Sequence, residues 1–219
     1  MKRILMASMT IAAMLFLVST GSAATITWDY TNLFSGTAPA GIATATLTDV
    51  TGGVRITMSA AGLAPGEFVD GGQSNDGFFF NLNPAISAIK APSYVAGNTA
   101  DSIGFSTNGF KADGDGYYDL QFAWNPDASS RLTGTGLQGI ATYEILGLTT
   151  DDFDFTSVNG IPGTGNYLSA VHVQGIGPDD NSGWLSPGGG IPVPEPGSML
   201  LLGGGLLGLA SWGRKRFRK

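Results

Sequence analysis

The stretch Ala43-Thr-Ala-Thr-Leu-Thr-Asp-Val-Thr-Gly-Gly-Val-Arg-Ile-Thr-Met-Ser-Ala60 decides the fold. Its apolar residues fall at positions 43, 45 and 47, and again at 54, 56, 58 and 60, with polar residues between most of them. Alternation with a period of two is typical of a strand that buries one face. Gly52 and Gly53 provide the backbone freedom that a short hairpin turn needs. We therefore predict two half-buried antiparallel strands joined by a turn.

Similar alternation recurs through the middle of the chain, at residues 26–30, 78–82, 118–124, 141–145, 153–155 and 168–173. About eight short strands separated by Gly, Asn, Asp and Pro predict an all-β domain, built as a β-sandwich or jelly-roll. Thirty-four Gly among 219 residues and a charged fraction of 13% agree with strands and turns. No segment repeats at a fixed period, so a solenoid is excluded.

The chain contains no cysteine. Its fold therefore has no disulfide framework and no cysteine-based zinc site, and no cysteine nucleophile is present. A domain of this size can bury enough apolar surface to fold without such links.

Charge is distributed unevenly along the chain. Between residues 25 and 193, four Lys and Arg accompany sixteen Asp and Glu, which gives this part a net charge of −12. A surface with this charge repels nucleic acid, so we expect no nucleic-acid partner, and it attracts divalent cations.

The N-terminus has the parts of a secretory signal peptide. Lys2 and Arg3 precede the apolar run 11–18, and small residues at Ser22 and Ala24 suit cleavage by signal peptidase. We place the signal peptide at residues 1–24. An uncleaved anchor helix is the alternative, but the apolar run is shorter than the ~20 residues that a membrane span needs.

The C-terminus combines an extended strip, an apolar run and a basic tail. Pro192, Pro194 and Pro196 forbid helix, so this strip is extended, as a peptidase active site requires. At ~1.5 Å per residue, the run 198–212 covers little more than two-thirds of a ~30 Å hydrocarbon core, so we expect a short transmembrane helix. The basic residues after it would stay on the cytoplasmic side.

The sequence Val193-Pro-Glu-Pro196, followed by an apolar run and an Arg/Lys-rich end, resembles the PEP-CTERM sorting signal of exported proteins. These proteins occur in Gram-negative bacteria that make exopolysaccharide. The resemblance implies recognition of Val193, Pro194, Glu195 and Pro196 by an exosortase and cleavage near them. It also implies a transient stay in the inner membrane, followed by delivery to the cell surface or extracellular matrix. An ordinary tail anchor with a proline linker is the alternative.

These features divide the chain into a signal peptide (1–24), an exported β domain (25–185), a Gly/Pro linker (186–192) and a sorting signal (193–219). Segments of the middle also resemble the exported part of one group of PEP-CTERM proteins, among them 45–50, 80–84, 110–116 and 172–177. That resemblance implies no catalytic residue.

A loop of carboxylates precedes the expected strand at 118–124. Asp113, Asp115 and Asp119 offer the hard oxygen ligands that calcium prefers, on a turn bent by glycines. The EF-hand pattern fails, because tyrosines fill its fifth and sixth places. Calcium binding and a plain Asp-Gly turn are the two interpretations.

Other candidate residues have structural alternatives. The acid clusters at Asp151, Asp152 and Asp154 and at Asp179 and Asp180 could in principle serve glycoside hydrolysis. We favour a solvated strand face, because alternation puts Asp152 and Asp154 opposite Phe153 and Phe155. His172 is the sole histidine and no Gly-x-Ser-x-Gly elbow accompanies it, so we expect a hydrogen-bonded structural role. The aromatic residues Trp28, Trp124, Trp184, Tyr117 and Tyr118 belong to a core or, if exposed, stack on sugar rings.

Three functions remain. The first is a non-enzymatic surface or matrix protein, structural or adhesive, associated with exopolysaccharide or biofilm. The second is a carbohydrate-binding module with a defined glycan, and the third a polysaccharide hydrolase. We favour the first.

Overall fold

A computed structural model of the chain describes residues 23–70, 76–83, 85, 89–113, 115–134, 136–157 and 167–188. These residues form strands and two short 3-10 helices, and no α-helix occurs among them. The elements are β1 (Thr25–Gly36), β2 (Ile42–Val50), β3 (Gly53–Gly62), β4 (Phe68–Val69), β5 (Phe78–Phe80), β6 (Ser93–Gly97), β7 (Ser102–Lys111), β8 (Tyr117–Ala123), β9 (Leu132–Thr133), η1 (Gly136–Gly139), β10 (Ile140–Leu146), η2 (Thr150–Phe153), β11 (Ser169–Ile176) and β12 (Asn181–Pro187). The all-β prediction is confirmed.

The hairpin predicted at residues 43–60 is present as β2 and β3. The strands pair antiparallel from Val50 and Gly53 at the turn to Ile42 and Gly62 at the far end. Gly52, in the turn, has a φ of +79°, a value that favours glycine. The predicted strands and the turn between them are therefore confirmed.

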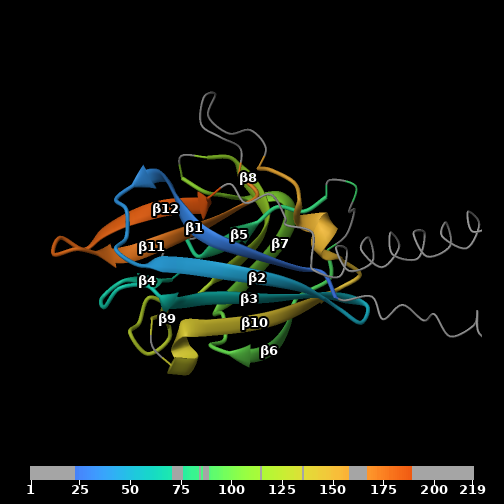
Figure 1. The fold of residues 1–219 in the computed structure, drawn as a ribbon, viewed down its shortest axis with the longest axis horizontal. Coiled ribbons are helices and arrows are strands. Elements are labelled where there is room, and N and C mark those ends of the chain that lie inside the picture. The colour runs from blue at the N-terminus through green and yellow to red at the C-terminus, as the bar shows by residue number, and fades with distance from the viewer. Residues whose placement is uncertain are drawn as a thin grey trace, which may run out of the picture. The chain divides into compact units, whose positions relative to one another are not determined.

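The strands form one continuous antiparallel sheet rather than two separately paired sheets. Its order is β6-β10-β3-β2-β1-β12-β11-β5-β8-β7. β4 pairs with β11, and β9 pairs with β4. Figure 1 shows β1, β2, β3, β10 and β6 lying side by side in this order. Neither the sandwich nor the jelly-roll description is confirmed.

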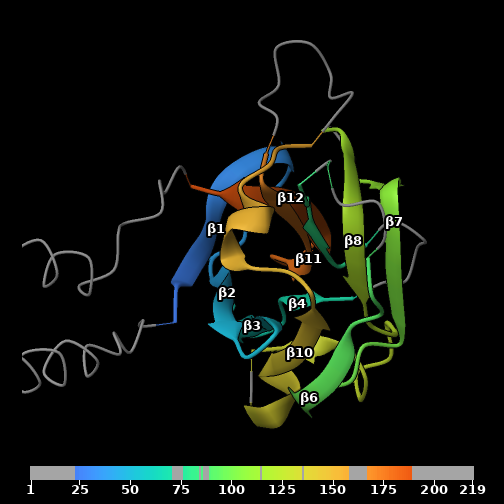
Figure 2. The same cartoon turned by 90° about the vertical axis from the view of Figure 1, so that its right-hand side faces the viewer.

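The connection between the two edge strands shows that the sheet must curl. β6 ends at Gly97 and β7 begins at Ser102, although they are the opposite edges of the path. Five residue steps span at most about 18 Å, whereas ten strands laid flat would separate their edges by roughly 43 Å. The sheet therefore closes on itself partway, as the end-on view in Figure 2 shows.

The main core lies inside this curl. It takes the inward residues of the hairpin, among them Leu47, Ile56 and Met58, all fully buried. Opposite strands contribute Phe78, Phe80 and Phe122. Burying each such side chain contributes about 1.5–3 kcal/mol.

A second apolar cluster covers the outer face of the other half of the sheet. Phe79 lies between Phe78 and Phe80 in β5 and points to the opposite face, where it packs against Tyr118 and Trp184. β5 is therefore buried on both faces, which explains its unbroken apolar sequence.

Two local expectations differ from the structure. The predicted strand at 153–155 is wrong, because Phe153 ends the 3-10 helix η2. Thr149 and Asp152 form a capping box that starts this helix. β12 continues to Pro187, two residues into the stretch expected to be a linker.

The predicted signal peptide and sorting signal lie almost wholly outside the described residues, which begin at residue 23 and end at residue 188. Within the described part, no helix is long and apolar enough to cross a membrane.

Candidate functional site

The sorting residues Val193, Pro194, Glu195 and Pro196 lie outside the described part of the chain. The last described strand, β12, is held on both sides, by β1 and by β11. The chain is therefore held in the sheet up to Pro187, just before the undescribed Gly/Pro segment begins.

The carboxylates proposed for calcium differ in their surroundings. Asp113 is exposed, whereas Asp115 and Asp119 are buried, with 1% and 8% exposure. Among the described residues, no group of three His, Cys, Asp or Glu side chains lies close enough to hold a metal ion. Calcium binding stays a prediction.

Asp115 accepts two buried hydroxyl groups on one oxygen. The Tyr118 hydroxyl donates to Oδ2 at 2.6 Å, and the Ser157 hydroxyl donates to the same oxygen at 2.6 Å. Burial, and then the nearby Asp115 charge, raise the pKa of Tyr118 far above its ordinary value. The cluster joins β8 to the segment after η2 and holds Tyr118 as a neutral donor.

Asp119, in β8, joins the segment after β5 to the irregular part of β7 through backbone hydrogen bonds. Its Oδ2 accepts the Leu82 N–H at 2.9 Å, and its Oδ1 accepts the Asn108 N–H at 2.6 Å. Both oxygens therefore have protein donors, an arrangement that favours the structural interpretation of this residue.

His172 occupies a buried site on β11. Its Nδ1 lies 2.8 Å from Oδ1 of Asp76, and its ring stacks on Trp184 with centroids 4.5 Å apart. Ala170 packs in the second apolar cluster with Trp184, on the same face of β11 as His172, whereas Leu168 packs against the main core. The geometry supports the expected structural role.

The tryptophans do not form an exposed platform. Trp28, Trp124 and Trp184 are 3%, 1% and 5% exposed, and Tyr118 is fully buried. The carbohydrate-stacking interpretation of these residues is wrong, because both faces of the sheet near β5 carry apolar clusters that enclose them.

The acidic cluster at 151–154 caps a helix rather than lining a strand. Asp152 Oδ2 accepts the backbone N–H of Thr149 at 2.8 Å and the Thr149 hydroxyl at 3.1 Å. The carboxylate of Asp152 is thus used in forming η2.

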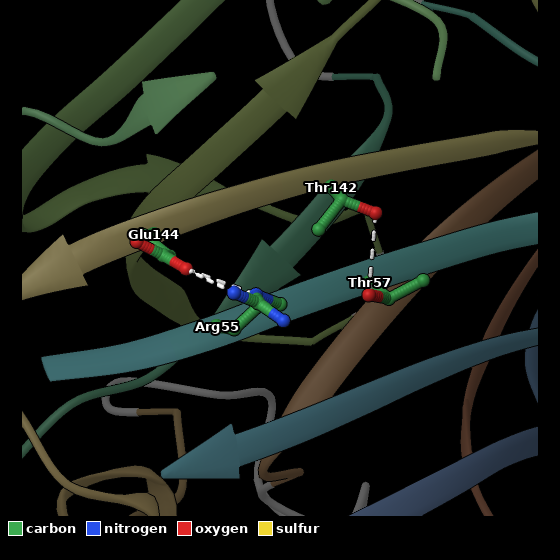
Figure 3. Close-up of polar contacts among 4 residues, drawn as sticks. All are labelled: Arg55, Thr57, Thr142 and Glu144. Carbon is green, nitrogen blue, oxygen red and sulfur yellow. Dashed lines mark hydrogen bonds and ion pairs between the residues drawn. The ribbon is translucent and has the colours of Figure 1, made fainter. Parts of the chain in front are cut away.

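A face rich in hydroxyl groups covers the outside of β1, β2, β3 and β10. Thr27, Thr46, Thr57 and Thr142 are cross-strand neighbours in one row. Their hydroxyls pair at 3.2 Å between Thr27 and Thr46 and at 3.3 Å between Thr57 and Thr142. Figure 3 shows the second of these pairs.

A neighbouring row carries the one described Arg–carboxylate ion pair. Arg55 donates from Nε and Nη2 to Oε1 of Glu144, at 2.9 and 2.7 Å (Figure 3). Thr25 and Thr48 continue this row, with hydroxyls 3.3 Å apart. We call the two rows together the hydroxyl face.

The hydroxyl face was visible in the sequence as the polar half of each alternating strand. Alternation by itself indicates only which side chains face the core. Cross-strand register, which makes the threonines neighbours, needed the structure.

Comparison with known proteins identifies the C-terminal segment. Residues 192–216 match the PEP-CTERM protein-sorting motif. No curated protein and no solved structure matches the chain significantly. The motif includes Val193, Pro194, Glu195 and Pro196, as predicted, and it marks an exported chain that passes the membrane and is sorted by exosortase.

Proposed function

We propose that this exported, exosortase-sorted chain is a non-enzymatic component of the cell surface or extracellular matrix. The observation that carries the proposal is the sorting motif at residues 192–216. By analogy with proteins that carry this signal, processing frees the β domain from the inner membrane. The domain then resides among exopolysaccharide, where its role is structural or adhesive.

The surface of the domain suits a hydrated polysaccharide. The hydroxyl face pairs threonines across four adjacent strands, and those on β1, β2 and β3 are at least partly exposed, whereas Thr142 on β10 is buried. Hydroxyl groups both donate and accept hydrogen bonds, so they match the groups of a neutral glycan and of the water around it.

Three buried carboxylates form hydrogen bonds that hold the domain together. Glu67 accepts three backbone N–H groups, from Ala40, Gly41 and Ala64, at 2.5, 3.0 and 2.9 Å. Asp115 accepts the hydroxyls of Tyr118 and Ser157, and Asp119 accepts the backbone N–H groups of Leu82 and Asn108. These three carboxylates serve the fold, which is the use expected of them in a non-catalytic domain.

Cell fractionation in the native host tests the proposal. We expect the wild-type chain in the matrix or outer-surface fraction, with its basic C-terminal peptide removed as judged by mass spectrometry. A variant with Pro194→Ala, Glu195→Ala and Pro196→Ala should remain in the membrane with that peptide attached. Pro65→Ala, in an exposed loop of the domain, is the control and should behave as wild type.

Two results would contradict the proposal. Wild-type protein recovered outside the cell with its Arg/Lys end intact would show that the sorting signal is not used. Release of new reducing ends from the host polysaccharide by the purified protein would favour the hydrolase interpretation instead.

A further inference from the structure

The described residues form a polar hollow where the curled sheet fails to close. It has a volume of about 490 Å³ and lies beside the link between the edge strands β6 and β7. Its lining residues are Gly97, Asn98, Thr99, Ala100, Asp101, Asn125, Ser129, Ser130, Leu137 and Gln138. The volume lies within the ~300–1,000 Å³ range that is typical of small-molecule sites.

The walls of the hollow are fixed by hydrogen bonds. The Asn98 side chain donates from Nδ2 to the backbone carbonyls of Ser130 and Arg131, at 3.0 and 3.1 Å. Gln138 donates from Nε2 to the Ser129 carbonyl at 2.9 Å. These bonds connect three chain segments, so the hollow is formed before any ligand arrives and little ordering is lost on binding.

The β6–β7 link is attached to the sheet by further bonds. The Ala100 N–H donates to the Tyr143 hydroxyl at 2.6 Å, and the Asp101 N–H donates to the Ala123 carbonyl at 2.8 Å. The position of Thr99, between these residues and Asn98, is therefore set by the fold.

The lining combines neutral polar groups with exposed apolar surface. Amide and hydroxyl side chains dominate it, while Leu137, in η1, is 81% exposed. Tyr94 is 51% exposed, and its hydroxyl donates to the carbonyl of Gly97, a lining residue, at 2.9 Å. Tyr94 is not itself a lining residue, but its hydroxyl is adjacent to one. Sugars present hydroxyl groups around C–H surfaces, so they match both kinds of group.

Charge restricts the class of glycan. Asp101 is the one ionisable side chain among the described lining residues. Arg131, whose carbonyl borders the hollow, holds its guanidinium 3.8 Å from the centroid of the Phe68 ring. With a net charge of −12 over residues 25–193, the domain repels uronic acids and phosphates.

We infer that this hollow binds a short segment of a neutral polysaccharide. The inference rests on the proposed function, because export to a polysaccharide environment supplies the ligand. It goes further by assigning a binding site and a ligand class. Leu137 and Tyr94 would contact the C–H faces of the sugar, and the amide and hydroxyl groups would contact its hydroxyls.

Calorimetric titration of the exported protein, purified from its host, tests the inference. The probes are cellotetraose, laminaritetraose, maltotetraose, xylotetraose and neutral oligosaccharides prepared from the host's own exopolysaccharide, with tetragalacturonate as the anionic probe. We expect saturable binding of at least one neutral probe and none of tetragalacturonate.

Matched variants locate the binding. Leu137→Ala and Thr99→Val should each weaken binding about three- to tenfold. Both residues are exposed, so neither change should unfold the protein, and a thermal melt checks this. Leu146→Ala, at a leucine 50% exposed at the far end of β10, and Thr107→Val, on exposed β7, should bind as wild type.

Each other result overturns the inference. These results are no binding of any neutral probe, preference for tetragalacturonate, or affinity unchanged in both hollow variants. Failure here is separable from failure of the proposed function. Protein that is correctly processed and retained in the matrix but binds no sugar would contradict the hollow alone, whereas protein that binds sugar but never reaches the matrix would contradict the proposed function alone.

Discussion

Asp119 shows at the scale of one residue why a carboxylate in an acidic loop need not be a metal ligand. The sequence offered calcium or a turn as its role, and the structure gives each oxygen a backbone donor. Without this carboxylate, both N–H groups would lack an acceptor. Asp119 therefore stabilises the fold whether or not a metal ion binds.

We therefore predict that Asp119→Ala destabilises the exported protein by about 2–3 kcal/mol, because it removes the acceptors of the Leu82 and Asn108 N–H groups. Urea unfolding measures this change. Asp113→Ala, at an exposed residue, should change stability by less than about 0.5 kcal/mol. If the turn interpretation holds, EDTA should leave the thermal midpoint unchanged. A fall in the midpoint with EDTA, reversed by excess calcium, would instead establish the calcium site.

Three buried tyrosines predict alkaline destabilisation. Burial raises the pKa of Tyr30, Tyr118 and Tyr143 above the ordinary value of about 10. In the unfolded chain these groups lose their protons above about pH 10, whereas in the folded chain they keep them. Their contribution to stability is therefore full below pH 10 and is lost progressively above it, by up to about 1.4 kcal/mol per pH unit for each group.

Tyr118→Phe separates this effect from other alkaline changes. Unfolding free energies measured between pH 8 and pH 11 should fall less steeply above pH 10 in the variant, because one of the three groups is removed. At pH 7 the variant should be about 1 kcal/mol less stable, since Asp115 loses a donor. Equal slopes for the two proteins would show that Tyr118 does not titrate with unfolding.

At the scale of elements, strands with one buried face could be predicted from the sequence, and others could not. β2, β3 and β10 alternate because their outer face meets water and their inner face meets the core. β7 is an edge strand in which seven of ten residues are exposed, so its sequence carries no alternation. β12 was missed because its run Gly183–Ser186 is buried on both faces and contains small and polar residues.

The 3-10 helix η2 shows a different limit. Asp152 and Asp154 alternate with Phe153 and Phe155 over too short a stretch to distinguish a strand from a turn. Thr149, three residues before Asp152, was the available signal for a helix start. The polar hollow had no sequence signal, because its residues come from three separate segments.

Two glycines with similar backbone angles predict different costs of substitution. Gly52 and Gly97 have φ of +79° and +88°. A Cβ at Gly52 would meet no atom within 4 Å, whereas one at Gly97 would lie 2.1 Å from the Ile140 carbonyl oxygen. Gly52→Ala should therefore cost about 1–2 kcal/mol, from the backbone angle alone.

Gly97→Ala should cost at least about 2 kcal/mol more than Gly52→Ala, because β6 must also move away from β10. Hydrogen exchange should then show faster exchange in β6 and β10 without an equal change in β11 and β12. Similar unfolding free energies for the two variants would contradict the close approach at Gly97.

At the scale of the whole molecule, charge separates the exported domain from its sorting signal. Residues 25–193 carry −12, whereas the segment from 194 onward carries Glu195 and five basic residues, Arg214, Lys215, Arg216, Arg218 and Lys219. Basic residues beside an apolar segment are held on the cytoplasmic side of a membrane. The acidic domain and the basic tail are therefore suited to opposite sides of a membrane.

Replacing those five basic residues by glutamine should reduce the processed fraction severalfold. The apolar run 198–212 is short for a membrane span, so without its charged anchor it should hold the sorting motif poorly at the membrane. Each basic residue near an anionic leaflet contributes about 1 kcal/mol of attraction. Pulse labelling followed by mass spectrometry of the C-terminal peptide measures the processed fraction.

The control variant carries Lys90→Gln and Lys111→Gln on the exported domain. It removes charges of the same sign away from the tail and should be processed normally. Normal processing of the tail variant as well would contradict this prediction. It would show that exosortase needs only the Pro-Glu-Pro strip and the apolar run, and not the basic tail.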